Sequence, residues 1–193
     1  MNDPTDPLSS LGRTLLKLDP DGYGALVPSS GGGNAIAQDL LESARPADLI
    51  SGSIKSPDDA DAMLAGLWLY FDCLDQSHRI SQRLENPTGS FWHAIMHRRE
   101  GDFSNSKYWY ARCASHPTLA TLAANAPRLI NEMPADKSLL RLIATGWNPS
   151  AFVDLVEQVH DKPNDPRHRS AVALQRLEWQ LLFDHCTRQA GGG

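Results

Sequence analysis

Apolar residues recur at helical spacing along most of the chain from residue 34 onward. The clearest stripe is formed by Leu64, Leu67, Phe71 and Leu74, whose intervals of three and four residues place them on one face of a helix. No alternating run rich in valine, isoleucine and threonine is long enough to predict a sheet. The pattern therefore predicts an all-α fold, a multi-helix bundle or array.

Capping and breaking residues divide this pattern into separate helices. Ser56 followed by Pro57 is typical of a helix start, whereas Pro46 and Gly101 indicate helix ends. Ser90 is the expected cap of the helix that ends before Gly101. The expected helices cover residues 35–44, 57–84, 90–100, 105–112, 117–133, 135–145, 149–160 and 170–189.

The first part of the chain has a different character, with short apolar pieces separated by proline and glycine. We expect residues 1–33 to form an irregular N-terminal extension, either packed on the domain or partly mobile. Its closing Ser-Ser-Gly-Gly-Gly run lacks the lysine and serine or threonine of a phosphate loop and predicts a flexible turn. Residues 34–193 are expected to form a single helical domain, which suits a chain of 193 residues.

Composition narrows the class of protein. A hydrophobic fraction of 41% and a charged fraction of 21% are typical of a globular chain, and a net charge of −5 argues against a nucleic-acid partner. The first ten residues lack the features of a signal peptide, and no apolar run approaches the ~18 residues of a membrane span. Three cysteines without a CxxC pair suit a reducing compartment. We expect a cytoplasmic protein that binds neither nucleic acid nor membrane.

Positive charge is concentrated in the middle of this acidic chain. Residues 78–112 contain more basic than acidic side chains, namely Arg79, Arg83, Arg98, Arg99, Lys107 and Arg112 against Glu85, Glu100 and Asp102. This local excess suits a small anionic ligand better than a long polyanion. The alternative is a set of local ion pairs on solvated helix faces.

The apolar stripe of the expected helix 57–84 becomes polar at its C-terminal end. Asp75, His78, Gln82 and Glu85 continue the same three- and four-residue spacing and so share the face that carries the leucines. An unpaired buried polar group costs ~1–3 kcal/mol. These side chains must therefore pair with other protein groups or line a wet cavity.

The next helix carries a matching polar face. His93, His97 and Glu100 lie at positions i, i+4 and i+7, on the side that also carries Trp92 and Met96. Two histidines one turn apart project their imidazoles in the same direction and are able to ligate one metal ion. The central glutamate of the HExxH motif is missing, which excludes a zinc protease of that type.

Three interpretations of this face remain open. In the first, His78, His93 and His97 hold a divalent metal such as zinc, with Glu100 or Asp75 as a carboxylate ligand or as an orienting group. In the second, a metal-free pocket uses His78 or His93 as acid or base. In the third, the histidines and carboxylates form a satisfied network inside the core.

Neighbouring side chains add binding groups to the second interpretation. Arg98 or Arg99 would hold an anionic group, and Tyr108 and Trp109 offer hydrogen bonding and stacking. Arg98 falls roughly opposite His93 on the helix, which favours a position facing solvent or a neighbouring helix.

Three stretches of this region, residues 75–82, 89–103 and 105–109, resemble a family of uncharacterised, mainly bacterial proteins. They read DQSHRISQ, GSFWHAIMHRREGDF and NSKYW, and the position of Asp75 is more often glutamate in that family. The resemblance covers about 35 residues and implies no reaction. It indicates where a site lies, not what the site does.

The leading hypothesis is a polar pocket that binds a small polar or anionic molecule, with or without a divalent metal, and catalyses hydrolysis or isomerisation. The pocket is built from Asp75, His78, Gln82, Trp92, His93, His97, Glu100 and Tyr108, with Arg98 and Trp109 as further ligand-binding residues. The expected catalytic residues are His78, His93 and Glu100. The alternative is a non-catalytic helical module that binds a partner or forms a homo-oligomer, with an exposed apolar patch and a fully paired histidine network.

Overall fold

The computed structural model describes residues 7–29, 33–132 and 137–191, and within these ranges the expected all-α fold is confirmed. The described chain contains helices, turns and two isolated bridges, and no strand. The helices are α1 (Ser10–Leu18), α2 (Ala35–Ser43), the 3₁₀ helix η1 (Pro46–Leu49), α3 (Pro57–Tyr70), α4 (Leu74–Ser81), α5 (Pro87–Glu100), α6 (Phe103–Arg112), α7 (Pro117–Asn131), α8 (Lys137–Arg141), α9 (Pro149–Val159) and α10 (Pro166–Gly191).

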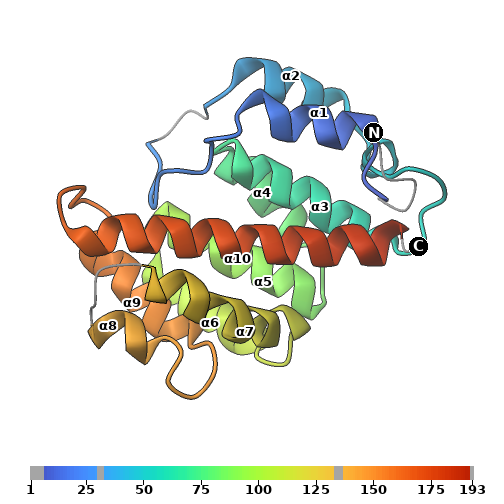
Figure 1. Cartoon of the computed structure of the whole chain (residues 1–193). Coiled ribbons are helices and arrows are strands. Elements are labelled where there is room, and N and C mark those ends of the chain that lie inside the picture. Colours follow the sequence, from blue (N-terminus) through green and yellow to red (C-terminus); the bar gives the residue numbers. More distant parts are fainter. Residues whose placement is uncertain (1–6, 30–32, 133–136, 192–193) are drawn as a thin grey trace.

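Helix α10 crosses the whole molecule and organises the packing (Figure 1). Helices α1 and α2 lie on one side of it, next to α3 and α4, while α6 to α9 lie on the other side. Helix α5 contacts α3, α4 and α6 and is surrounded by them and by α10. Its residues from Thr88 to Arg99 are all buried, so this helix has no solvent-facing side along most of its length.

The predicted single helix over residues 57–84 is wrong, because the chain breaks between α3 and α4. Helix α3 ends at Tyr70, Asp72 adopts a positive φ of 61°, and α4 begins at Leu74. The buried guanidinium of Arg99 on α5 binds the end of α3 and the link itself, donating to the carbonyl of Leu69 at 2.5 Å and to the carboxylate of Asp72 at 2.6 Å. An arginine 27 positions further along the chain thus pairs with the carboxylate of the residue at the break and with a carbonyl of the last turn of α3.

Helix α5 starts one turn earlier than Ser90, the cap that the sequence favours. Asn86 is the cap, since its side-chain oxygen accepts a hydrogen bond from the backbone N–H of Gly89 at 2.8 Å, and Pro87 occupies the first turn. The predicted end at Gly101 is confirmed, where the left-handed φ of 87° suits glycine.

The N-terminal extension is more regular than expected. It contains α1, capped by the hydroxyl of Ser9, and Leu15 of this helix is fully buried. The backbone N–H of Ser9 also donates to the carbonyl of Leu49 at 2.8 Å, which ties the extension to η1. Part of the glycine run, residues 30–32, and the meeting point of two expected helices, residues 133–136, lie outside the described residues.

Candidate metal centre

Three histidines from two helices meet at one point of the fold. His78 of α4 lies against His93 and His97 of α5, and one nitrogen from each ring falls within 4.8 Å of the other two. The ring centroids are 4.8 Å apart for His78 and His93, 4.7 Å for His93 and His97, and 5.4 Å for His78 and His97. The side chains at these three positions therefore form a compact imidazole cluster.

Local structure explains why these rings converge. His93 and His97 lie one turn apart on α5, so they share one face. The break at Asp72 and the short link through Asn86 let α4 pack against α5, and this places His78 opposite them.

His93 is the most unusual member of the cluster. Its side chain is 4% exposed, and neither ring nitrogen has a hydrogen-bond partner in the described part of the chain. Burial, with smaller contributions from the neighbouring His97 and His78, lowers the pKa of His93 to about 3. The ring is therefore neutral at physiological pH, with an unused lone pair, which is rare for a buried polar group.

His97 is held by two polar side chains. Its Nδ1 lies 3.1 Å from a carboxylate oxygen of Glu100, and its Nε2 lies 3.1 Å from the side-chain nitrogen of Asn105. With Nδ1–H donating to Glu100, Nε2 carries the lone pair that the Asn105 amide contacts. A carboxylate that holds the second nitrogen is typical of metal-binding histidines. Burial lowers the pKa of His97, and the bond to Glu100 partly opposes this shift.

Three imidazole nitrogens are a donor set that suits zinc and other late first-row divalent ions. Two nitrogens bound to one tetrahedral zinc lie roughly 3.3 Å apart, since each Zn–N bond is about 2.0–2.1 Å long. Metal binding would therefore draw the three rings slightly together from the 4.8 Å limit seen here, and the Asn105 amide would have to release Nε2 of His97.

A polar cleft lies beside the cluster. Trp109 of α6 stacks on His93 with ring centroids 4.0 Å apart, and it also lines this cleft of about 720 Å³, which we call the Trp109 cleft. The Arg112 guanidinium lies 5.3 Å from the centroid of the Trp109 ring. The other lining residues are Gln82, Leu84, Glu85, Asn86, Pro87 and Ser90. The cleft thus offers an aromatic wall, a cation and several hydrogen-bonding groups next to His93.

The structure distributes the remaining expected site residues over different environments. Gln82 lines the Trp109 cleft, and Glu100 contacts His97 with its side chain about half exposed (53%). Asp75 and Tyr108 are exposed, and neither is hydrogen-bonded to the three histidines among the described residues.

Two expected ligand-binding residues lie elsewhere, in the core. Trp92 is fully buried and packs against Gly66 and Trp179. Arg98 is also fully buried, and its guanidinium donates to Glu178 and to the hydroxyl of Tyr110, both at 2.5 Å. We therefore assign Trp92 and Arg98 to the interior of the protein, because Trp92 packs among core residues, Arg98 is paired there, and neither lines the Trp109 cleft.

Three basic side chains of this stretch are paired with carboxylates, two of them in the interior and one at the surface. Arg98 pairs with Glu178, Arg99 with Asp72, and Lys107 with Asp154. Arg112 is the basic residue of this region that lines the Trp109 cleft. An anionic ligand there would meet one guanidinium, not a broad basic surface.

Asn105 is a contact residue that the sequence alone did not single out. It lies eight positions after His97, beyond the turn at Gly101, so no helical spacing relates the two side chains. The one sequence feature that points to Asn105 as a site residue is its place in the stretch NSKYW.

Comparison with known proteins assigns neither a family nor a function to the chain. No protein-family model, curated protein or solved structure matches the chain. The resemblance of the three central stretches to a mainly bacterial family stays a prediction. Within the described ranges, the helices are all too short or too polar to cross a membrane.

Proposed function

We propose that this protein binds a divalent transition metal ion, with zinc as the first candidate, through His78, His93 and His97. One observation carries the proposal: His93 is buried with both ring nitrogens unpartnered, yet it contacts two other imidazoles. A buried polar group without a partner costs about 1–3 kcal/mol. A bound cation would use the lone pair of one ring nitrogen and remove the part of that cost that belongs to this nitrogen.

The proposed ion would serve catalysis. Three protein ligands leave one position of a tetrahedral ion for water or substrate, and zinc lowers the pKa of such a water to about 7. The Trp109 cleft would receive a small polar or anionic molecule beside this position, with Arg112 at its wall. We propose metal-assisted hydrolysis as the reaction, with isomerisation as the second choice, and Glu100 as the group that orients His97.

A non-catalytic helical module is the competing function. It requires a fully paired histidine network, which the unpartnered nitrogens of His93 do not support. It also requires a continuous apolar patch, whereas the large exposed hydrophobic residues in the described ranges, Ile36, Tyr108 and Leu140, lie on three different helices.

Elemental mass spectrometry tests the metal proposal. The protein is purified without an affinity tag or chelator, incubated separately with zinc, iron(II) or manganese(II), and desalted. We expect roughly one equivalent of bound zinc in the wild type and a loss of that zinc in His93→Ala and His97→Ala. His168→Ala, which removes a histidine outside the cluster, is the matched control and should keep its zinc.

Circular dichroism of the metal-free proteins separates loss of the site from loss of the fold. The proposal is supported if the variants retain wild-type helicity and lose zinc. It is overturned if the folded variants bind as much zinc as the wild type, or if the wild type takes up no zinc, iron or manganese.

A further inference from the structure

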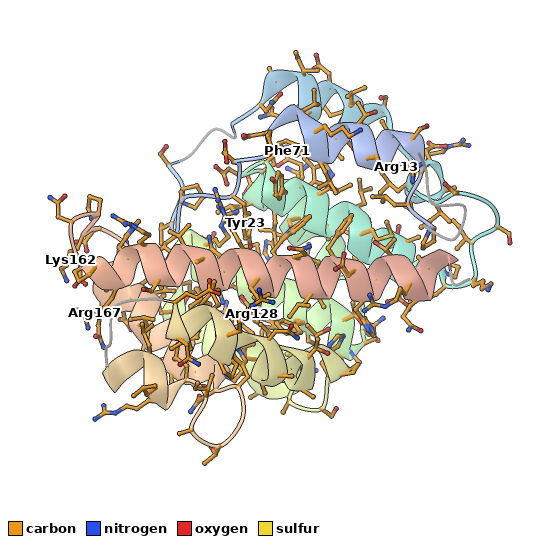
Figure 2. All side chains as sticks on the ribbon, viewed as in Figure 1. Arg13, Tyr23, Phe71, Arg128, Lys162 and Arg167 are labelled. Carbon is orange, nitrogen blue, oxygen red and sulfur yellow. The ribbon has the colours of Figure 1, made fainter. Side chains whose placement is uncertain are left out.

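A second cavity lies between α1 and α10, apart from the histidine cluster. It has a volume of about 450 Å³, within the range of about 300–1,000 Å³ that small-molecule sites occupy. Figure 2 shows Tyr23, one of its lining residues, between α10 and the layer formed by α1 and α2. We call this cavity the aromatic pocket because Tyr23, Tyr70, Trp179 and Phe183 line it.

The rings of the aromatic pocket are arranged as flat walls. Trp179 and Phe183 stack with centroids 4.7 Å apart and planes 11° apart. Tyr70 lies 4.8 Å from Trp179, and Tyr23 and Tyr70 are parallel, with centroids 6.0 Å apart. Ring faces and edges of this kind favour a planar ring as partner, since aromatic pairs gain energy beyond the area they bury.

Tyr23 supplies an unused polar group. Its side chain is 2% exposed, and its hydroxyl has no hydrogen-bond partner among the described residues. Burial raises the pKa of Tyr23 to about 12, so the phenol keeps its proton and is able to donate it. A buried donor without an acceptor is costly, and an acceptor on a ligand would satisfy it.

Tyr23 is also held in an uncommon conformation. Its φ of 61° lies in the left-handed region, which is strained for a bulky residue. The guanidinium of Arg99 lies 4.0 Å from the centre of its ring and fixes the ring from the side of α5. Strain of this kind persists where the surrounding structure imposes it, and it is concentrated at ligand sites.

We propose that the aromatic pocket binds a small planar aromatic molecule that carries a hydrogen-bond acceptor, such as a carbonyl oxygen. The ring packs against the aromatic walls and the acceptor receives the hydrogen bond of Tyr23. The site does not depend on the metal proposed for the histidine cluster, since the residues that line it do not include the three histidines.

Two neutral indole probes of similar size test the role of the hydroxyl. 3-Acetylindole carries a carbonyl oxygen, whereas 3-ethylindole lacks it. Both are titrated into ¹⁵N-labelled protein, and the shifts of the indole N–H of Trp179 report binding. Tyr23→Phe removes only the hydroxyl and breaks no internal hydrogen bond, so we expect this variant to fold. It should weaken binding of 3-acetylindole about tenfold and leave binding of 3-ethylindole unchanged.

A pocket-filling variant tests the location. Leu16→Trp places a large ring at the α1 wall of the pocket and should abolish the shifts caused by 3-acetylindole. Leu140→Trp adds the same ring at an exposed position of α8 and should leave them unchanged. The proposal is overturned if 3-acetylindole fails to shift wild-type resonances, if Tyr23→Phe binds both probes as tightly as the wild type, or if Leu16→Trp still binds.

Discussion

The indole ring of Trp109 covers the imidazole of His93, with ring centroids 4.0 Å apart and planes 26° apart. Trp109 comes from α6 and His93 from α5, and the turn at Gly101 brings the two helices together. Trp109 also lines the Trp109 cleft, so one indole ring contacts both His93 and that cleft. The burial that keeps the His93 ring uncharged and the shape of the Trp109 cleft therefore both depend on the side chain of Trp109.

The first prediction concerns this indole ring. Trp109→Ala should expose His93 to water and raise its pKa from about 3 toward the ordinary value near 6.5, since burial is the main cause of the shift. A proton NMR titration of the imidazole signals in metal-free protein measures this. Tyr108→Ala, which truncates the exposed neighbouring ring, should leave the pKa of His93 in place. An unchanged pKa in Trp109→Ala would contradict the assigned cause.

The second prediction concerns Glu100, whose carboxylate contacts Nδ1 of His97. Glu100→Gln keeps the shape of the side chain and removes its charge, so zinc affinity should fall by about 10–100-fold. Competition with a coloured zinc chelator measures the affinity. Glu132→Gln, at the exposed end of α7, is the control and should bind zinc like the wild type. Equal zinc affinities for Glu100→Gln and Glu132→Gln would show that Glu100 does not support zinc binding.

The third prediction is a pH dependence of stability in the metal-free protein. The folded pKa of His93, about 3, lies below the value near 6.5 expected in the unfolded chain. Between these values the unfolded chain binds a proton that the folded protein does not. The free energy of unfolding should therefore fall as the pH drops from about 6.5 toward 3, and this contribution should be constant above pH 6.5.

Urea unfolding of wild type and His93→Gln at several pH values from 7 to 4.5 isolates this contribution. The variant lacks the titrating ring, so its stability should fall less steeply with decreasing pH. Parallel curves for the two proteins would show that His93 contributes nothing to the pH dependence.

The fourth prediction concerns the buried pair of Arg98 and Glu178. Glu178→Gln leaves the guanidinium of Arg98 buried without its counter-charge and should cost about 3–5 kcal/mol in the free energy of unfolding. The double variant Arg98→Met, Glu178→Leu should recover most of this loss, because both charges are removed. Asp154→Asn breaks the exposed pair with Lys107 and should cost no more than about 1 kcal/mol. A small effect of Glu178→Gln in chemical denaturation would contradict this account.

Local signals were sufficient for most helices and insufficient for the break between α3 and α4. The end of α5 at Gly101 and the start of α3 at Pro57 follow from residues at those positions. The break depends on Asp72, whose carboxylate is held by Arg99 from 27 positions away. No local spacing reveals such a contact, so the polar stripe after Leu74 predicts one continuous helix.

The same limit explains what was missed in the site. The cluster of His78, His93 and His97 was foreseen from helical spacing, although the helix assumed to carry His78 is in fact interrupted. Arg98 was expected to face solvent or a neighbouring helix, and its fully buried pairing partner Glu178 lies 80 positions away on α10. Helix α5 is buried on all sides, so its sequence does not distinguish the face toward the cluster from the face toward the core.

X-ray absorption at the zinc edge of the zinc-reconstituted protein tests the central claim most directly, because it reports the ligands of the ion itself. The account predicts three imidazole nitrogens at about 2.0–2.1 Å, one fewer in His78→Ala, and a remaining light-atom ligand from water. A spectrum without imidazole scattering, or one that is the same in wild type and His78→Ala, would contradict a metal centre built from His78, His93 and His97.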